Sequence, residues 1–418
     1  MQRNMVPILL FIVILFFLDL YIYQAVKTVT ADLKPATRQI VTILYWIVSA
    51  ATLFTIMAMP WLRNQPSSPA LRMYPIAIML GILIAKLLSV SFFVVDDLRR
   101  AIQWVYQYFS SPASPAGVVA KSGEAISRST FLSWLGLGVG GSIFGTLLYG
   151  FKNQYNYQVR EVKMVFKNLP AAFRGLKIAH ISDIHSGSFM DKAEVLKGIE
   201  TINNLSPDVI LFTGDLVNDR ALEMEPYTGI FSQLSAPMGV YSTLGNHDYG
   251  DYAQWNSKEE KEQNLEKLKQ THALMGWKLL MDESVLLEKN GEKIGLIGVQ
   301  NISGKASFHS YGNLEKAYRD SASMPFKILM SHDPSHWDAA VRKQYPDIDL
   351  TLSGHTHGMQ FGVELPWFKW SPVQWMYRQW AGLYEEGEQK LYVNRGFGFI
   401  GYPGRVGILP EITLIELA

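Results

Sequence analysis

Four long apolar runs constrain the fold of this chain more than any other feature. A helix needs about 20 apolar residues to cross a lipid bilayer, and the four runs, near residues 5–26, 38–60, 73–95 and 131–150, are long enough. The first run is too long for a cleaved signal peptide, and no small-residue cleavage site follows it. We therefore expect residues 1–151 to form an α-helical membrane domain of about four transmembrane helices.

Glycines recur in the fourth run. Gly136 and Gly140 stand four residues apart, as do Gly141 and Gly145, so each pair falls on one face of a helix. Such spacing lets a neighbouring helix approach closely. We predict a packing role for these glycines and assign them no chemistry.

Lysine and arginine favour one side of the predicted spans. The segments between spans one and two and between spans three and four hold Lys27, Lys34, Arg38, Arg99, Arg100, Lys121 and Arg128. The opposite side holds Arg3, Arg63, Arg72 and Lys152. Because the more positive side stays in the cytoplasm, we expect the N-terminus and everything after residue 151 to be extracytoplasmic.

Two charged residues, Asp19 and Lys86, lie inside predicted spans. An ionisable residue within a membrane is a functional hypothesis by default. The alternative is a structural ion pair, or side chains that extend to the membrane interface. We favour the structural interpretation.

Beyond residue 157, short apolar runs alternate with amphipathic stretches. The expected strands are 177–182, 208–213, 239–244, 279–287, 293–299, 326–331, 349–353, 390–394 and 411–417. The expected helices are 191–204, 225–235, 257–275 and 312–320. Strands interleaved with helices predict a layered α/β domain over residues 157–418.

Five short polar motifs each follow one of these strands. They are Asp183-Ile184-His185, Gly214-Asp215, Gly245-Asn246-His247-Asp248, Ser331-His332 and Gly354-His355-Thr356-His357-Gly358. Strand ends are where α/β folds place chemistry, because side chains there leave a rigid sheet for loops that shape a site. Packing alone does not explain five such motifs in one domain.

The donor types in these motifs predict the metal. The chain has no cysteine, so any metal must be held by nitrogen and oxygen atoms. Imidazole with carboxylate and amide oxygen suits Mn, Fe or Zn, and is too rich in nitrogen for a dedicated Ca or Mg site. Seven candidate ligands are too many for one ion and fit two divalent ions that share a bridging carboxylate.

Taken in order, the five motifs resemble those of the calcineurin-like metallophosphoesterase superfamily. The stretches Ala381-Gly382-Leu383-Tyr384, Asn394-Arg395-Gly396 and Pro410-Glu411-Ile412-Thr413-Leu414 further resemble a bacterial branch of membrane-associated phosphohydrolases. The resemblance covers roughly residues 160–418 and leaves the spans outside it. It implies a layered α/β/β/α sandwich and a metal-dependent phosphoric ester hydrolase in a bacterial inner or cell membrane.

The resemblance also implies a role for each motif residue. One metal would be held by Asp183, His185 and His357, and the other by Asn246, His332 and His355, with Asp215 bridging. His247 would face the phosphoryl group, and Asp248 would orient His247. The implied reaction is direct attack of metal-bound hydroxide on a phosphomonoester, phosphodiester or pyrophosphate. The remaining histidines lack such motifs: we expect His180 in the core and His336 on a helix surface.

An aromatic segment, residues 365–384, follows the last motif. It contains Trp367, Phe368, Trp370, Trp375, Tyr377, Trp380 and Tyr384. Tryptophan and tyrosine beside Lys369 and Arg378 favour the membrane–water interface. The segment either rests on the bilayer and admits a lipid-linked phosphoester, or caps a small core of its own; the sequence supports both interpretations equally.

Two other functions compete with this one. A nuclease or nucleotide phosphodiesterase fits the metal motifs, but a net charge of +1 and the lack of a basic stripe argue against long nucleic acid. We therefore expect no nucleic-acid partner. The second alternative is a membrane transporter or sensor with a regulatory phosphoesterase domain, which rests on Asp19 and Lys86 alone.

Overall fold

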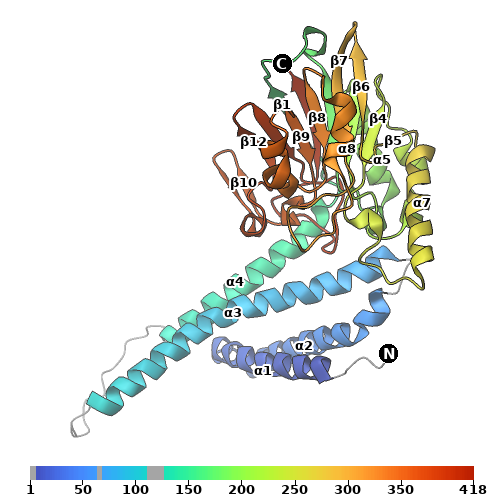
Figure 1. Cartoon of the computed structure of the whole chain (residues 1–418). Coiled ribbons are helices and arrows are strands. Elements are labelled where there is room, and N and C mark those ends of the chain that lie inside the picture. The colour runs from blue at the N-terminus through green and yellow to red at the C-terminus, as the bar shows by residue number, and fades with distance from the viewer. Residues whose placement is uncertain (1–5, 64–67, 111–126) are drawn as a thin grey trace, which may run out of the picture. The chain divides into compact units, whose positions relative to one another are not determined.

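The computed structural model describes residues 6–63, 68–110 and 127–418. The chain divides into two compact units, Met1–Tyr149 and Gly150–Ala418, here called the membrane unit and the C-terminal unit (Figure 1). Arg3 and Lys121, two of the residues that predict the orientation, lie outside the described residues.

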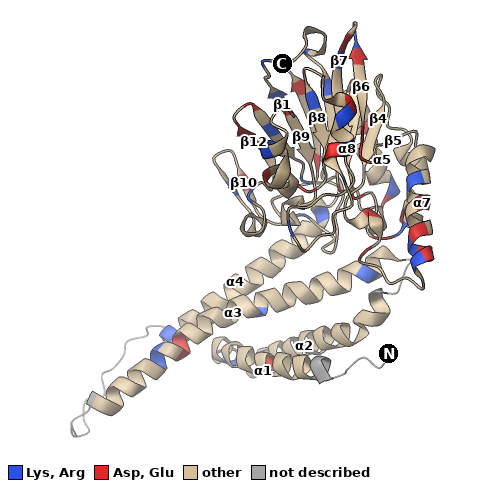
Figure 2. Ribbon diagram, viewed as in Figure 1, with Lys and Arg blue, Asp and Glu red and all other residues tan. Residues whose placement is uncertain are grey.

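The membrane unit contains four long helices among its described residues. They are α1 (Val6–Val29), α2 (Pro35–Arg63), α3 (Pro69–Ser110) and α4 (Arg128–Gly150). All four are long and apolar enough to cross a membrane. Figure 2 shows long uncharged stretches in each helix, with acidic and basic residues gathered on neighbouring parts of α3 and α4.

Helix α3 is far longer than the predicted span 73–95. Its 42 residues extend about 63 Å, roughly twice the thickness of the hydrocarbon core of a bilayer. The apolar run ends at Asp96 and Asp97, but the helix continues because Arg99 and Arg100 form ion pairs with these two carboxylates one helical turn away. Hydropathy therefore located the span and missed the rest of the helix.

Asp19 and Lys86 form an ion pair inside the membrane unit. The Lys86 Nζ atom lies 2.5 Å from Asp19 Oδ1 and 3.2 Å from Ser49 Oγ. Tyr45 donates a hydrogen bond to the Asp19 backbone oxygen at 2.7 Å. Both charges are buried and satisfied by residues of α1, α2 and α3, which agrees with the structural interpretation.

The two glycine pairs of α4 differ in their surroundings. A Cβ atom on Gly136 would lie 2.7 Å from the Phe93 ring, and one on Gly140 would lie 2.6 Å from the Ala85 backbone oxygen. The first pair therefore permits the close approach of α3. Around Gly141 and Gly145, no atom of the described part of the chain lies within 4 Å of such a Cβ, so the predicted packing role holds only for the first pair.

The C-terminal unit contains two six-stranded sheets and a two-stranded hairpin, counted over its described residues. The first sheet contains β1 (Gln158–Met164), β14 (Glu411–Leu417), β2 (Lys177–Ile181), β3 (Val209–Thr213), β4 (Val240–Thr243) and β5 (Lys278–Leu279), in that spatial order. The second contains β12 (Gly382–Glu386), β13 (Gln389–Val393), β9 (Leu350–Ser353), β8 (Lys327–Met330), β7 (Glu292–Gly298) and β6 (Glu283–Lys289). The hairpin pairs β10 (Val363–Leu365) with β11 (Phe368–Trp370).

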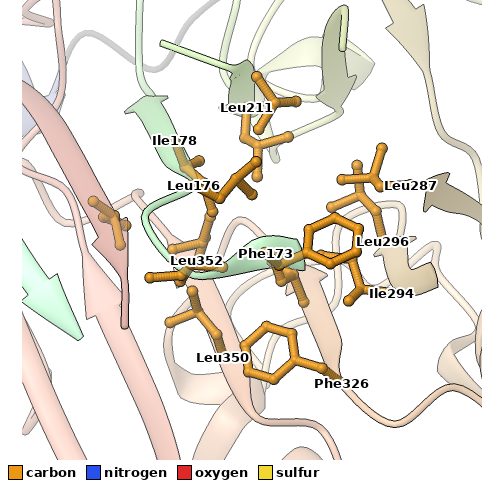
Figure 3. Close-up of a cluster of buried hydrophobic side chains, with 14 of the residues drawn as sticks. Phe173, Leu176, Ile178, Leu211, Leu287, Ile294, Leu296, Phe326, Leu350 and Leu352 are labelled. Atoms are coloured by element: carbon orange, nitrogen blue, oxygen red, sulfur yellow. The ribbon is translucent and has the colours of Figure 1, made fainter. Parts of the chain in front are cut away.

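The strands that carry the motifs run parallel. In the first sheet β2, β3, β4 and β5 are parallel neighbours, while β14 is antiparallel to β2 and parallel to β1. In the second sheet β7, β8, β9 and β13 are parallel, and β6 and β12 close the edges in antiparallel pairing. The inner faces of the two sheets share one apolar core. Figure 3 shows Ile178 and Leu211 of the first sheet near Leu296 and Leu352 of the second.

Helices cover the outer faces of both sheets, which gives the predicted layered α/β/β/α arrangement (Figure 1). The α-helices among the described residues of this unit are α5 (Lys192–Asn204), α6 (Thr228–Phe231), α7 (Lys258–Leu274), α8 (Leu314–Tyr318) and α9 (Arg342–Gln344). Helix α5 begins where the Asp191 side chain accepts hydrogen bonds from two free amides of the first turn, and α7 begins where the Ser257 side chain accepts one.

Several expected elements differ in extent. The expected strand 279–287 is two strands, β5 and β6, because Asp282 adopts a left-handed backbone (φ 58°) and turns the chain between them. The expected helix 225–235 is reduced to α6. Four strands were missed: β1, β10, β11 and β12. Strands β1 and β12 lie at the edges of the two large sheets, and β10 and β11 form the isolated hairpin. Polar residues interrupt the apolar pattern of such exposed strands.

Candidate metal centre

All five polar motifs lie at the carboxyl ends of parallel strands. They follow β2, β3 and β4 in the first sheet, and β8 and β9 in the second. Because these ends meet at the same edge of the two facing sheets, residues up to 174 positions apart in sequence come into contact there: the His357 Nε2 atom lies 3.3 Å from Asp183 Oδ1.

The first group of potential ligands contains Asp183, His185 and His357. One ligand atom from each lies within 4.8 Å of the others, and all three residues are buried. The His185 and His357 rings stack with centroids 4.9 Å apart. The structure thus brings together the three residues that the resemblance assigned to one metal.

The second group contains Asp215, His332 and His355, with ligand atoms again within 4.8 Å of one another. The Asn246 side-chain oxygen joins them, at 3.1 Å from His332 Nε2 and 2.8 Å from His355 Nδ1. Asp215 Oδ2 lies 3.1 Å from His332 Nε2 and 3.6 Å from His185 Nε2. Asp215 therefore stands between the two groups, where a bridging carboxylate has to be.

Unsatisfied nitrogen atoms test whether these residues fit metal ions. Three buried nitrogen atoms, His185 Nδ1, His185 Nε2 and His357 Nε2, have no hydrogen-bond partner among the described residues. A buried polar atom without a partner costs about 1–3 kcal/mol. Cations placed among these nitrogens and the carboxylates of Asp183 and Asp215 would satisfy them, so the donor set fits two divalent ions.

Burial keeps several of the imidazoles in the neutral form that metal ions bind. Burial lowers the pKa of His185 to about 3 and that of His355 to about 4, so both rings are neutral at neutral pH. Burial also disfavours the charged form of His332, but the adjacent Asp215 carboxylate outweighs it and raises the pKa of His332 to about 10. A cation that binds His332 would displace this proton, so we expect metal affinity to rise with pH.

The ligand loops have an unusual backbone. Left-handed φ values occur at five of the candidate ligands: Asp183 (52°), His185 (49°), Asp215 (62°), His355 (72°) and His357 (48°). Such conformations cost non-glycine residues about 1–3 kcal/mol each and persist where the surroundings enforce them, which is common at functional sites. Gly354 is required here because a Cβ atom at this position would collide with the Asp183 carboxylate.

The hydrogen bonds of His247 and Asp248 differ from the expected arrangement. His247 Nδ1 lies 2.7 Å from the Asn218 backbone oxygen, so a carbonyl group and not a carboxylate orients this ring. The Asp248 carboxylate is buried and accepts hydrogen bonds from the backbone amides of Asp215, Leu216, Val217 and Gly245. The expected role of Asp248 is therefore wrong in this structure: its side chain points back into the turn that carries Asp215.

Three residues that contact the ligands were not found from the sequence. The Tyr377 hydroxyl lies 2.7 Å from His355 Nε2, and the buried Asp333 Oδ2 lies 3.8 Å from the same nitrogen. The Tyr252 hydroxyl accepts a hydrogen bond from the Asn246 amide nitrogen at 3.0 Å, which turns the amide oxygen toward His332. The only sequence signal was position: Asp333 directly follows His332, and Tyr377 lies in the aromatic segment.

Two further histidines, His180 and His336, are buried near the metal-site strands. His180 is buried, with its Nε2 atom 2.9 Å from Thr213 Oγ1, which confirms its predicted place in the core. The prediction for His336 was wrong. It is buried, and its Nδ1 atom lies 2.9 Å from Ser331 Oγ, so it supports the end of β8 next to His332.

The aromatic segment divides into a buried part and an exposed part. Val373, Tyr377, Trp380, Ala381 and Ile408 form a small core, as one of the two interpretations required. Trp367 and Trp375 nevertheless leave 81% and 75% of their surface exposed. The cap interpretation therefore explains only half of the segment.

Together, the fold and the centre define a class of protein. Two groups of potential nitrogen and oxygen ligands lie at one edge of a two-sheet α/β unit, with Asp215 within 3.6 Å of a histidine from each group. The same chain carries four candidate membrane helices among its described residues. This combination is that of an integral membrane protein with the ligand set of a dinuclear metallohydrolase.

Comparison with known protein families gives the same class. Residues 176–359 match the family model described as "Calcineurin-like phosphoesterase". Residues 2–154 match the one described as "Probable Calcineurin-like phosphoesterase, transmembrane domain", so the membrane unit too has a family match. The chain belongs to the calcineurin-like phosphoesterase family, whose members are metal-dependent phosphoester hydrolases with a dinuclear centre.

Individual relatives match between about half and two thirds of this chain. YkuE, an uncharacterized metallophosphoesterase of Bacillus subtilis, is 30% identical over 256 residues, which are 60% of this chain and 81% of YkuE. The "transmembrane protein with metallophosphoesterase domain" of Danio rerio is 29% identical over 62% of this chain, and the match spans only 57% of that relative. LpxG of Chlamydia trachomatis, a UDP-2,3-diacylglucosamine pyrophosphatase, is 29% identical over 55% of this chain and 81% of LpxG.

Proposed function

We propose that this chain hydrolyses a phosphomonoester, phosphodiester or pyrophosphate with two Mn, Fe or Zn ions bound at the centre described above. The observation that most directly supports this proposal is the position of Asp215 between two groups of potential ligands, one around His185 and the other around His332. We assign Asp183, His185 and His357 to one ion, and Asn246, His332 and His355 to the other.

The ions would supply an activated water near neutral pH and neutralise charge on the phosphoryl oxygens. His247 is the residue of this chain that acts on the substrate. Its Nδ1–H group donates to the Asn218 carbonyl. In the imidazolium form Nε2 carries a second proton, which it can transfer to the leaving oxygen or use to stabilise the phosphoryl charge. The backbone amide of His247 also donates to Asp215 Oδ1 at 2.9 Å. This hydrogen bond fixes the position of the proposed acid relative to the proposed bridging carboxylate.

A lipid-linked phosphoester is our proposed substrate class. It is supported by the four membrane helices and by the similarity to LpxG, which acts on a diacylated pyrophosphate. We further propose that the C-terminal unit is extracytoplasmic in a bacterial inner membrane. The described lysine and arginine residues that flank the spans, with Lys27 and Arg99 among them, support this orientation.

Metal analysis and a hydrolysis screen test this function together. The purified full-length chain is loaded with Mn, Fe or Zn and offered an aryl phosphodiester, nucleotides, phospholipids and lipid pyrophosphates. We expect two ions per chain and turnover with at least one metal. Absence of turnover with every metal would overturn the proposal, and a preference for nucleotides over lipids would overturn the substrate class.

Two variants separate the enzyme from a transporter or sensor. Asp215→Asn should abolish hydrolysis, because it removes the shared ligand. The double variant Asp19→Asn with Lys86→Gln, which removes the membrane ion pair, should hydrolyse a soluble ester at the parental rate. The opposite pattern would favour a transporter or sensor.

Single cysteines test the orientation, because the chain has none of its own. Cysteine at exposed Leu274 of the C-terminal unit should react with a membrane-impermeant maleimide on intact cells. Cysteine at exposed Leu33, between α1 and α2, should react only after permeabilisation. Reversed labelling would place the C-terminal unit in the cytoplasm.

A further inference from the structure

One apolar surface of the C-terminal unit is exposed without serving the metal centre. We call it the hairpin surface. It consists of Val363, Leu365, Trp367, Phe368, Trp375 and Met376, all exposed. Six large apolar side chains within 14 residues are more than the scattered single residues that a soluble surface normally shows.

The hairpin surface belongs to a rigid element. Strands β10 and β11 pair in register, with Val363 opposite Trp370 and Leu365 opposite Phe368. Glu364, the middle residue of β10, forms ion pairs with Arg160 at 2.7 Å and with Arg395 at 2.5 Å. Arg395 is itself buried and paired with Glu411 of β14. A chain of charges therefore anchors the hairpin to the first sheet, and its apolar side chains are held outward.

The base of the hairpin lies close to the point where the chain leaves the last candidate span, which ends at Asn153. There, the Gly150 backbone oxygen accepts a hydrogen bond from the Arg405 amide at 3.0 Å, and the Phe151 and Tyr402 rings are 5.5 Å apart. The same loop pairs with the residues just before β10, since the Gly362 amide donates to the Val406 oxygen at 2.9 Å. One loop thus joins the end of the span to the hairpin.

We propose that the hairpin surface docks on the lipid bilayer beside the end of α4. Tryptophan, phenylalanine and aliphatic side chains next to the cations Lys369 and Arg378 have the composition of an interfacial membrane anchor. Whatever covers the hairpin surface must lie near residues 150–153, where the last candidate span ends. The bilayer that holds this span lies there, and no partner protein is needed.

Docking would bring the bilayer next to the metal centre. Tyr377 follows Met376 of the hairpin surface directly, and its hydroxyl contacts the ligand His355 at 2.7 Å. The docked surface would therefore end at the residue before Tyr377, whose hydroxyl touches the proposed ligand His355. This part rests on the proposed function, and it names the bilayer as the source of the substrate.

Site-specific fluorescence tests docking without any activity measurement. Trp367→Cys and Trp375→Cys, each in the full-length chain, are labelled with a polarity-sensitive dye and reconstituted into vesicles that contain brominated phospholipids. Leu274→Cys, exposed on α7, is the matched control. We expect bromolipid quenching several-fold stronger at positions 367 and 375 than at 274. Equal quenching at all three would overturn the proposal, and a dye shielded from water yet not quenched would show that a second copy covers the surface.

An activity measurement tests the consequence. The double variant Trp367→Ser with Trp375→Ser should hydrolyse a lipid substrate in vesicles several-fold more slowly than the parent, and a small soluble ester at an unchanged rate. Equal loss on both substrates would overturn the role in substrate access. Quenching at 367 and 375 in a chain without any turnover would instead refute the proposed function and leave docking intact.

Discussion

The substitution Asp248→Asn distinguishes two roles for this residue. In the structure, Asp248 Oδ2 accepts from the amides of Asp215 and Gly245 at 2.9 and 2.8 Å, and Oδ1 accepts from Leu216 and Val217 at 2.8 and 3.3 Å. An asparagine offers one oxygen, so its NH2 group faces two amide donors. Each buried donor without an acceptor costs about 1–3 kcal/mol, so we expect a loss of about 2–6 kcal/mol in the free energy of unfolding.

The substitution should also weaken metal binding, because the destabilised turn carries Asp215, the proposed bridging ligand. We expect a lower melting temperature and fewer than two bound metal ions per chain, measured by thermal unfolding and elemental analysis of the same sample. His247→Gln is the control: it should keep stability and metal content and lose about 10²–10⁴-fold in turnover, the usual worth of a general acid.

A different result is expected if Asp248 acts on His247. If Asp248 orients His247 instead of the turn, Asp248→Asn will remain as stable as the parent and fully metal-loaded, and only its turnover will fall. Such a result would refute the role inferred from the four amide contacts.

Three further substitutions test separate parts of the chain. Tyr377→Phe removes the hydroxyl next to His355 and should weaken metal affinity about 10–100-fold in a chelator competition; unchanged affinity would show that the contact does not orient the ligand. Gly140→Val should destabilise the membrane unit by about 1–3 kcal/mol through overpacking against α3, whereas Gly141→Val should not, as measured by unfolding in detergent; equal effects would contradict the packing of α4. Burial lowers the pKa of His272 to about 3, so the folded chain binds fewer protons than the unfolded chain and loses stability as the pH falls below about 6.5. His272→Gln should therefore lose about 1 kcal/mol less than the parent between about pH 7.5 and 5.5 in thermal unfolding, and parallel profiles would show that this histidine does not contribute.

The position of the metal centre could be predicted because it depends on local sequence. An apolar run followed by a polar motif marks the end of a buried strand, and parallel strands bring such ends together wherever they lie in the chain. The strand ends placed the motifs of Asp183 and His357 in one region, although 174 positions separate the two residues; their assignment to one metal came from the family resemblance. The length of α3 could not be found in the same way, because its ion pairs between Asp96 and Arg99 look like the end of a span.

Side-chain direction was beyond the sequence. Asp248 follows His247 directly, but the short helical turn at His247–Tyr249 points its carboxylate toward the amides of Asp215 and Gly245. Tyr377 contacts His355 only because the segment between them folds back over a small core of its own. Such contacts depend on tertiary packing, which neither periodicity nor motif spacing encodes.

Strand β14 completes the first sheet between two strands that come much earlier in the sequence. Residues 411–417 pair with β1 on one side and β2 on the other, so the strand that leads to Asp183 has an open edge until they are made. Synthesis proceeds from the N-terminus, and α1–α4 are complete long before that point. The membrane helices can therefore insert while the C-terminal unit is still unfinished. All seven proposed ligands precede β14 in the sequence, but the edge of β2, the strand that ends next to Asp183, is covered only when β14 pairs with it.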